Sequence, residues 1–135
     1  MVLDEGNVKM KNKNCIKERA STGMGMHIVI STFDRPQGMR AEDLIEKFNQ
    51  SAPIYRDLEG LIRKHYLLGC EDDKAGGVYV FASRDDAEAW FTKDRIAWAE
   101  ERFGKITFQR FDVPIEVTTS PPMITPHPIP SRESQ

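Results

Sequence analysis

The order in which the hydrophobic patterns change along the central part of this chain constrains its fold more than any other feature. β-Branched runs have the period of strands, and apolar residues at steps of three and four mark helical faces. The patterns predict the order strand, helix, strand, strand, helix, strand over residues 27–33, 41–58, 61–68, 77–81, 83–104 and 106–113. Two β-α-β units of this size therefore follow one another in a single chain.

Capping signals and helix breakers refine these boundaries. Ser83 followed by Asp86 has the outline of a capping box, and Gly104 is a natural stop for the second helix. Pro53 interrupts the first helical pattern and follows Ser51, which could cap a restarted helix. We therefore expect either a kink or two helical pieces over 41–58.

Two interleaved β-α-β units with right-handed crossovers have few solutions, and the ferredoxin-like βαββαβ plait is the leading one. This α+β fold has a four-stranded antiparallel sheet with two helices on one face. In the strands 28–30 and 78–81, however, residues on both faces are apolar. A second copy of the chain is the simplest cover for the helix-free face, so we predict a homodimer packed sheet to sheet.

The remainder of the chain differs in composition from this central part. Residues 26–117 carry 13 basic and 17 acidic residues, whereas residues 1–25 have a net charge of +2. Five of the eight prolines lie in 118–135. We expect a ferredoxin-like domain over 26–117, a flexible N-terminal arm over 1–25 and an extended or disordered Pro-rich tail over 118–135.

Charge and composition exclude several classes of function. The formal charge of the 135 residues is −2, which disfavours a nucleic-acid binder. No apolar run approaches a bilayer span, and the first 25 residues lack the apolar block of a secretory signal. Cys15 and Cys70 have no metal-ligand spacing and are best interpreted as reduced thiols. We therefore expect a cytoplasmic protein with no membrane or nucleic-acid partner.

Three stretches resemble a known family. They are Gly60-Leu61-Ile62-Arg63-Lys64-His65-Tyr66-Leu67, Ala75-Gly76-Gly77-Val78-Tyr79-Val80-Phe81 and Ser83-Arg84-Asp85-Asp86-Ala87-Glu88-Ala89-Trp90. Together they resemble small monooxygenases of the dimeric α/β-barrel superfamily, which are related to the antibiotic-biosynthesis monooxygenases. The resemblance covers roughly residues 26–117.

The resemblance implies a ferredoxin-like protomer, a homodimer and a small-molecule pocket between sheet and helices. Members of the superfamily include oxygenases that need no metal or flavin, together with haem-degrading and decarboxylating proteins. The expected cofactor is therefore none, and the chain has no dinucleotide, phosphate-loop or metalloprotease motif. The tyrosine, asparagine and tryptophan roles of the best-understood relatives do not transfer, because their spacing is not recoverable in this sequence.

His65 is the candidate catalytic base among the three histidines. It lies in an apolar strand, and an imidazole titrates near neutral pH, as a base for a phenol or enol must. The alternative is a hydrogen-bonded histidine on the dimer face or an edge strand. His27 begins the first strand, and we expect it at the edge of the sheet. His127 lies in the Pro-rich tail.

Five further residues are candidates for substrate binding. Aromatic rings and one acid lie on the predicted strands and on one helical face, and could orient a small aromatic ligand: Tyr66, Tyr79, Trp90, Asp94 and Trp98. Core packing is the alternative for the aromatic residues. Asp94 needs a partner on this apolar stripe, and the alternatives are Arg63, Arg95 or a polar pocket mouth.

These residues predict a cofactor-independent monooxygenase that acts on a small aromatic or enolic compound. Two alternatives remain open. One is a non-catalytic dimeric module that binds a hydrophobic metabolite. The other is a haem-binding or haem-degrading relative, for which His65 or His27 would have to serve as the axial ligand.

Overall fold

The computed structural model describes residues 25–130, and the predicted arm over 1–25 therefore lies almost wholly outside the described residues. The chain forms two compact units, one of residues 27–111 and one in which residues 25–26 join residues 112–130. The domain boundaries 26–117 and 118–135 stay a prediction. The two units are described separately below.

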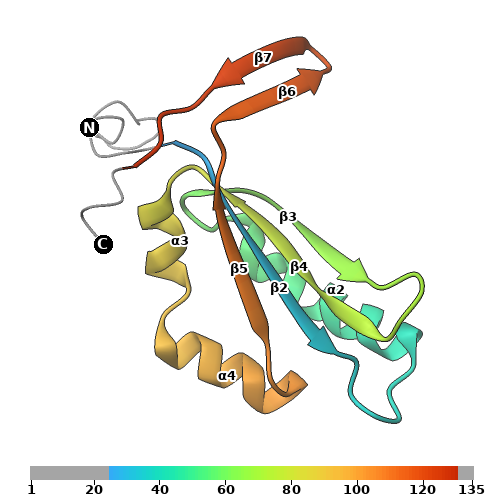
Figure 1. Cartoon of the computed structure of the whole chain (residues 1–135). Coiled ribbons are helices and arrows are strands. Elements are labelled where there is room, and N and C mark those ends of the chain that lie inside the picture. Colours follow the sequence, from blue (N-terminus) through green and yellow to red (C-terminus); the bar gives the residue numbers. More distant parts are fainter. Residues whose placement is uncertain (1–24, 131–135) are drawn as a thin grey trace. The chain divides into compact units, whose positions relative to one another are not determined.

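The larger unit is built on a four-stranded antiparallel sheet (Figure 1). Its strands lie in the order β3-β4-β2-β5, so the first and third strands along the chain form the centre of the sheet. Their bounds are β2 (His27–Asp34), β3 (Leu61–Leu68), β4 (Lys74–Phe81) and β5 (Thr107–Asp112). The ferredoxin-like α+β architecture predicted from the order of elements is confirmed.

Helix α2 (Ala41–Arg56) connects the first two strands and runs uninterrupted through Pro53. The two-piece alternative is therefore not observed. Ser51 does not cap a new helix, because its hydroxyl donates to the carbonyl oxygen of Phe48 at 3.1 Å. Proline lacks an amide hydrogen, so the helix forgoes a single hydrogen bond at this point and continues.

The single helix predicted over 83–104 is wrong, because the segment forms two helices, α3 (Arg84–Trp90) and α4 (Lys93–Phe103). Thr92 caps the second helix, since its Oγ1 accepts a hydrogen bond from the backbone amide of Arg95 at 3.2 Å. The predicted cap at the start of α3 is confirmed. Ser83 Oγ accepts from the amide of Asp86 at 3.0 Å.

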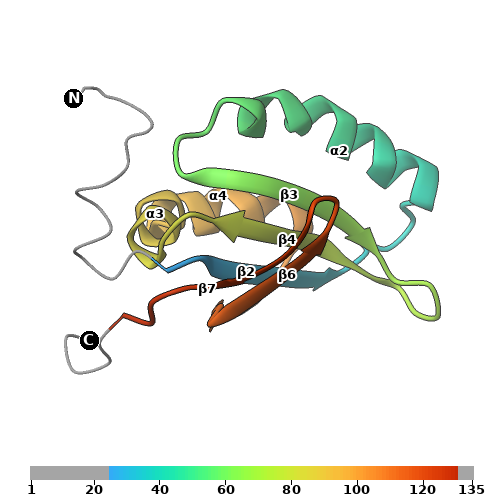
Figure 2. The same cartoon turned by 90° about the horizontal axis from the view of Figure 1, so that it is seen from above.

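Helices α2, α3 and α4 all pack on one face of the sheet, which Figure 2 shows from above. Two clusters of buried side chains lie beneath them. One cluster consists of Val29, Tyr79, Phe81 and Ala87. The other consists of Phe33, Leu44 and Ala75. The core therefore occupies the space between the sheet and the helices.

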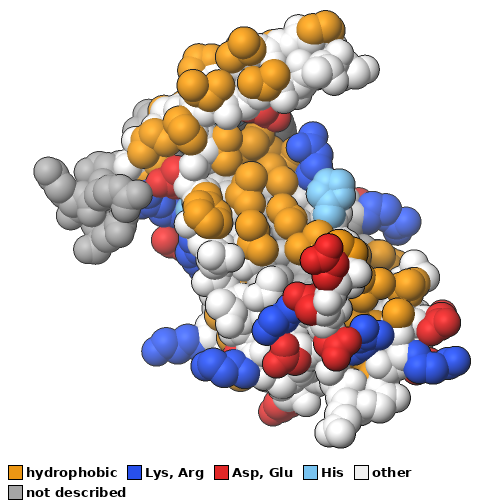
Figure 3. Space-filling view, turned by 45° about the vertical axis from the view of Figure 1, so that its right-hand side comes forward, with side chains coloured by type: hydrophobic (Ala, Val, Ile, Leu, Met, Phe, Trp, Pro, Cys, Tyr) orange, Lys and Arg blue, Asp and Glu red, His pale blue; other side chains and the backbone are white. Residues whose placement is uncertain are grey.

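The opposite face of the sheet carries apolar side chains that stay partly exposed. Ile30 and Val78 lie opposite one another on the two central strands, and alternation along each strand turns them away from the helices. His65 is the neighbour of Val78 on β3. Figure 3 shows hydrophobic side chains gathered over the sheet.

The smaller unit is a two-stranded antiparallel hairpin of β6 (Ile115–Thr119) and β7 (Pro122–Pro126). Strand β7 lies within 118–135, the Pro-rich segment that we expected to be extended or disordered. His127 closes the hairpin, since its amide donates to the carbonyl oxygen of Pro114 at 2.8 Å and its Nε2 lies 3.2 Å from Glu116 Oε1. Among the described residues, no helix is both long and apolar enough to cross a bilayer.

Candidate functional site

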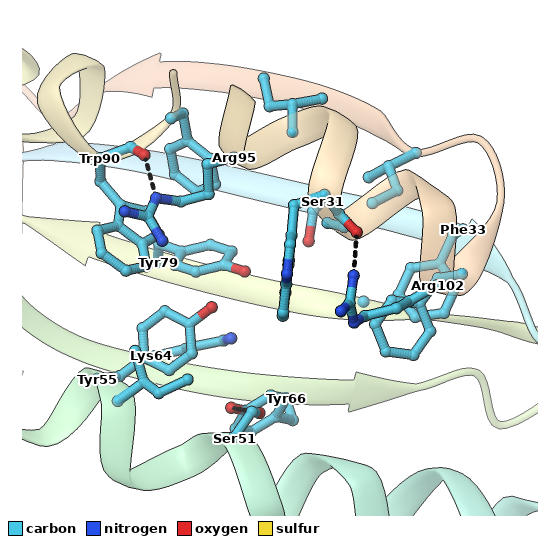
Figure 4. A pocket seen from close by; sticks show the side chains of 18 of the residues that line it. Ser31, Phe33, Ser51, Tyr55, Lys64, Tyr66, Tyr79, Trp90, Arg95 and Arg102 are labelled. Carbon is cyan, nitrogen blue, oxygen red and sulfur yellow. Dashed lines mark hydrogen bonds between the residues drawn. The ribbon is translucent and has the colours of Figure 1, made fainter. Parts of the chain in front are cut away.

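A cavity of about 710 Å³ lies between α2, α4 and the helix-covered face of the sheet. Its volume is within the range of small-molecule sites. All four strands and all three helices of the larger unit contribute to its lining, which is rich in aromatic residues and has a few cationic groups (Figure 4). The cavity therefore belongs wholly to the larger unit.

The ammonium group of Lys64 projects into this cavity among three tyrosine rings. Its Nζ lies 3.6 Å from the ring centroid of Tyr55, 4.0 Å from that of Tyr66 and 4.5 Å from that of Tyr79. These rings come from α2, β3 and β4, so the fold assembles the cage from three elements. We call these four residues the lysine cage.

Strand geometry explains why Lys64 points into the core side of the sheet. Side chains alternate along β3, so Lys64 and Tyr66 share one face, and Lys64 lies opposite Tyr79 of β4. Burial lowers the pKa of Lys64 to about 7. The negative faces of the three rings favour the charged form and oppose part of this shift. No described carboxylate contributes to this shift.

The hydroxyl groups of the cage are linked to their neighbours. Tyr79 hydrogen-bonds to both Tyr55 and Ser31, and burial raises its pKa far above the ordinary value for tyrosine. Burial also raises the pKa of Tyr55. Both phenols therefore stay protonated over the physiological range and can donate hydrogen bonds but not accept a substrate proton.

Tyr66 is held by two contacts with α2. Its hydroxyl lies 2.6 Å from Ser51 Oγ, and its ring stacks on Phe48 with a centroid distance of 4.5 Å. Burial raises the pKa of Tyr66 as well. These contacts fix the ring that forms one wall of the lysine cage.

Two arginines of α4 also line the cavity, each stacked on a tryptophan. The guanidinium carbon of Arg95 lies 3.4 Å from the ring centroid of Trp90, and that of Arg102 lies 3.7 Å from that of Trp98. Each arginine is anchored to the backbone carbonyl of its tryptophan, by Arg95 Nε at 2.8 Å and by Arg102 Nη1 at 2.9 Å. Both guanidinium groups are therefore held in defined positions along the cavity.

The structure brings together all five residues predicted to bind substrate: Tyr66, Tyr79, Trp90, Asp94 and Trp98 line the cavity. It does not bring His65 to them. His65 is exposed on the opposite face of β3, between the inward-pointing Lys64 and Tyr66. Asp94 makes no ion pair with Arg63 or Arg95 within the described residues, and it lines the cavity.

The other two histidines also lie away from the cavity lining. His27 is buried at the start of the central strand β2, opposite Phe81, and not at an edge of the sheet. His127 belongs to the hairpin unit.

The sequence reasoning missed Lys64 and its partner Tyr55. Lysine is ordinarily charged at neutral pH, so its side chain attracts attention as a base only when burial is known. One signal was present, since strand alternation places Lys64 and Tyr66 on the same face. That face could not be assigned to the core without knowledge of the packing.

Metal and haem ligands can be tested against the lining residues. Across residues 25–130, no group of three or more His, Cys, Asp or Glu side chains is arranged as a metal site. The described cavity lining holds no histidine, cysteine or methionine, and the imidazoles proposed as axial haem ligands lie elsewhere. The lining therefore does not fit a histidine-ligated haem.

Comparison with known proteins identifies the family. The chain resembles the NE2512 protein of unknown function from Nitrosomonas europaea, with a TM-score of 0.54 and 12% identity over 67% of this chain and 91% of that one. This likeness supports the fold alone. No curated protein is similar enough to count as a match. A family model described as "Putative mono-oxygenase ydhR" matches residues 29–121, which include the whole cavity. The chain therefore belongs to this mono-oxygenase family, and the resemblance seen in the sequence is confirmed.

Proposed function

We propose that the chain is a cofactor-independent monooxygenase that binds a small aromatic or enolic compound in the cavity and removes a proton from it with Lys64. The observation that carries the proposal is the Lys64 amine, which is buried among three tyrosine rings and faces the cavity. The membership of a mono-oxygenase family supports the class of reaction.

A base must be neutral before it can accept a proton. Because burial lowers the pKa of Lys64 to about 7, a substantial fraction of the amine is neutral at physiological pH. An ordinary surface lysine would be almost fully charged there. The cage also excludes water from the amine, which strengthens its interaction with the anion that forms.

The reaction balances without a cofactor. Lys64 takes a proton from an activated CH₂ group of the substrate, and the resulting carbanion gives electrons to dioxygen as a C–O bond forms. The ammonium group returns the proton to the peroxide, giving a hydroperoxide. Loss of water from this hydroperoxide breaks the O–O bond and leaves a ketone, so CH₂ and O₂ become C=O and H₂O.

The aromatic lining gives such a substrate its orientation. We propose that Tyr66, Trp90 and Trp98 contact its rings, and that the protonated Tyr79 hydroxyl donates to the oxygen on which negative charge collects. Asp94 lies on the exposed side of α4 and would contact only the polar edge of the substrate.

We also propose that two copies pack through the helix-free face of the sheet. The support is the row of partly exposed apolar side chains around Ile30 and Val78, since a one-sided sheet normally carries polar residues on its open face. In such a dimer His65 would lie at or near the contact. This placement corresponds to the alternative interpretation of His65 as a histidine on the dimer face or an edge strand.

Oxygen uptake with anthrone, a carbon acid with an activated CH₂ group, tests the proposal directly. We expect the purified protein to consume dioxygen and form the ketone, and Lys64→Met to lower the rate about 100-fold, as the loss of a general base does. Lys93→Met, on the exposed side of α4 outside the cavity lining, is the matched control and should keep full activity.

Oxygen uptake and thermal unfolding together separate the alternatives. Full activity in Lys64→Met would exclude this residue as the base. Thermal stabilisation of the protein by a panel of phenols and 1,3-diketones, none of which is oxidised, would indicate a non-catalytic binding module.

A further inference from the structure

The charge of the cavity is opposite to that of the region that encloses it. Residues 26–117 have four more acidic than basic residues. The charged side chains that line the cavity are four cationic groups and one acidic group: Lys47, Lys64, Arg95, Arg102 and Asp94. A cationic concavity in an acidic domain favours the binding of anions at that position.

Arg102 has the geometry of an anion-binding group within this set. Its Nη1 donates to the carbonyl oxygen of Trp98, and its plane is stacked on the Trp98 ring. The adjacent Nε and Nη2 donors are committed to no partner within the described residues. These two parallel donors form the edge that a carboxylate accepts in a bidentate pair.

No described acid occupies this edge. The ion pairs of the larger unit engage other basic residues, and neither Arg95 nor Arg102 takes part in them. Asp94 lies two helical turns before Arg102 on α4, and Lys47 of α2 is a further cationic group of the lining. A stacked, anchored and unpaired arginine at a cavity is poised for a ligand anion.

The exposure of Trp98 supports the same assignment. Half of this large apolar side chain is exposed (50%), which packing of the core does not explain. Figure 4 shows Arg95 and Arg102 at opposite ends of the cavity, with Lys64 between them. An aromatic ligand could therefore reach the lysine cage while a substituent meets Arg102.

We infer that the ligand of this cavity is an aromatic carboxylic acid and that the Nε–Nη2 edge of Arg102 binds its carboxylate. The inference rests on the proposed function for the identity of the reacting group, and adds the chemical class of the substrate. Arg102 is a binding residue in this assignment and takes no part in proton transfer.

Calorimetric titration with two matched ligands tests the inference. The probes are 1-hydroxy-2-naphthoic acid and its uncharged amide, which differ only in the group that would meet Arg102. We expect the acid to bind about tenfold more tightly or better, as a charge-assisted pair predicts, and added salt to reduce this preference. Equal affinities for acid and amide would overturn the inference.

Two variants of Arg102 and one control variant locate the effect. Arg102→Gln should remove the preference for the acid and change the affinity for the amide less than about twofold, while Arg102→Lys should retain only part of it because the fork is lost. Arg110→Gln, on exposed β5 outside the lining, should keep the full preference. Equal weakening of both ligands by Arg102→Gln would indicate a structural role and overturn the assignment.

A third probe and the oxygen assay complete the test. Tighter binding of 1-naphthyl phosphate than of the acid would contradict a carboxylate site. Preference for the acid without oxygen uptake would sustain the inference and remove the proposed reaction. Oxidation of uncharged anthrone with no preference for the acid would sustain the proposed reaction and overturn the inference.

Discussion

Lys64 Nζ lies 3.6 Å from the ring centroid of Tyr55, close enough for the face of the ring to stabilise its positive charge. Two opposing effects therefore act on one amine. Burial favours the neutral form, and the surrounding rings favour the charged form. Their balance sets the pH at which this amine changes charge.

The stability of the protein should depend on pH because the pKa of Lys64 differs between the folded and unfolded chain. The pKa of Lys64 is about 7 in the folded chain and its ordinary value is 10.5, so the unfolded chain binds more protons between these pH values. The free energy of unfolding should therefore rise with pH from about 7 upwards. Relative to Lys64→Met, we expect a gain of about 1–3 kcal/mol, since cation–π contacts offset part of the shift.

Urea unfolding between pH 6 and 9.5 measures this difference, because the tyrosines of the cage stay protonated over that interval. Lys93→Met should follow the wild type at every pH. Parallel stability curves for the wild type and Lys64→Met would show that the two states of the chain bind protons equally at this position.

The contact between Ser51 and Tyr66 should be energetically coupled. The two hydroxyl oxygens lie 2.6 Å apart in a half-buried position. Tyr66→Phe and Ser51→Ala should each lower the free energy of unfolding by about 1 kcal/mol, and the double variant by less than the sum. A double-mutant cycle from chemical denaturation measures the coupling, and strict additivity would mean that the hydrogen bond contributes nothing.

Thr92 should set the position of α4. Its Oγ1 is the cap of this helix, so Thr92→Ala should lower the free energy of unfolding by about 1 kcal/mol. Thr107→Ala, at an exposed position of β5, is the matched control and should change stability little. Thermal unfolding of the two variants compares them, and Thr92→Ser should restore most of the loss.

His65→Ala should leave oxygen uptake unchanged if Lys64 is the base, because His65 is exposed on the face of β3 opposite the cavity. The assay with anthrone and the wild-type protein as reference measures this. A fall in rate comparable to that of Lys64→Met would support His65 as a catalytic residue, as the sequence analysis predicted.

The proposed dimer makes a separate prediction. Val78→Asp puts a charge on the helix-free face, so it should convert a dimer into a monomer. Ile45→Asp, on an exposed side of α2 outside the cavity lining, is the control and should leave the dimer intact. Light scattering with size-exclusion chromatography gives the mass. A wild-type monomer would contradict the proposal before any variant is made.

The fold was predictable because local patterns determine its elements. The alternation and helical spacing that define the six segments are present in the sequence itself, and the topology has few solutions. The break between α3 and α4 was not predicted, because Trp90, Asp94 and Trp98 keep helical spacing across it. Only the cap at Thr92 marks the break, and threonines are common elsewhere.

The candidate site was predictable only in part. Tyr66, Tyr79 and the two tryptophans were found because aromatic residues on buried faces line either a core or a cavity. Lys64 was not found, since its altered pKa depends on rings from three separate elements. His65 attracted attention because histidine is the side chain whose unperturbed pKa lies nearest to neutral pH.

The three rings around Lys64 come from α2, β3 and β4, and this origin makes the amine a sensor of tertiary structure. If α2 moved away from the sheet, Lys64 would regain water and lose Tyr55 together with the hydroxyl contact that holds Tyr66. The susceptibility of this one lysine to an amine-modifying reagent at neutral pH would then report whether the helix is seated, without any ligand bound.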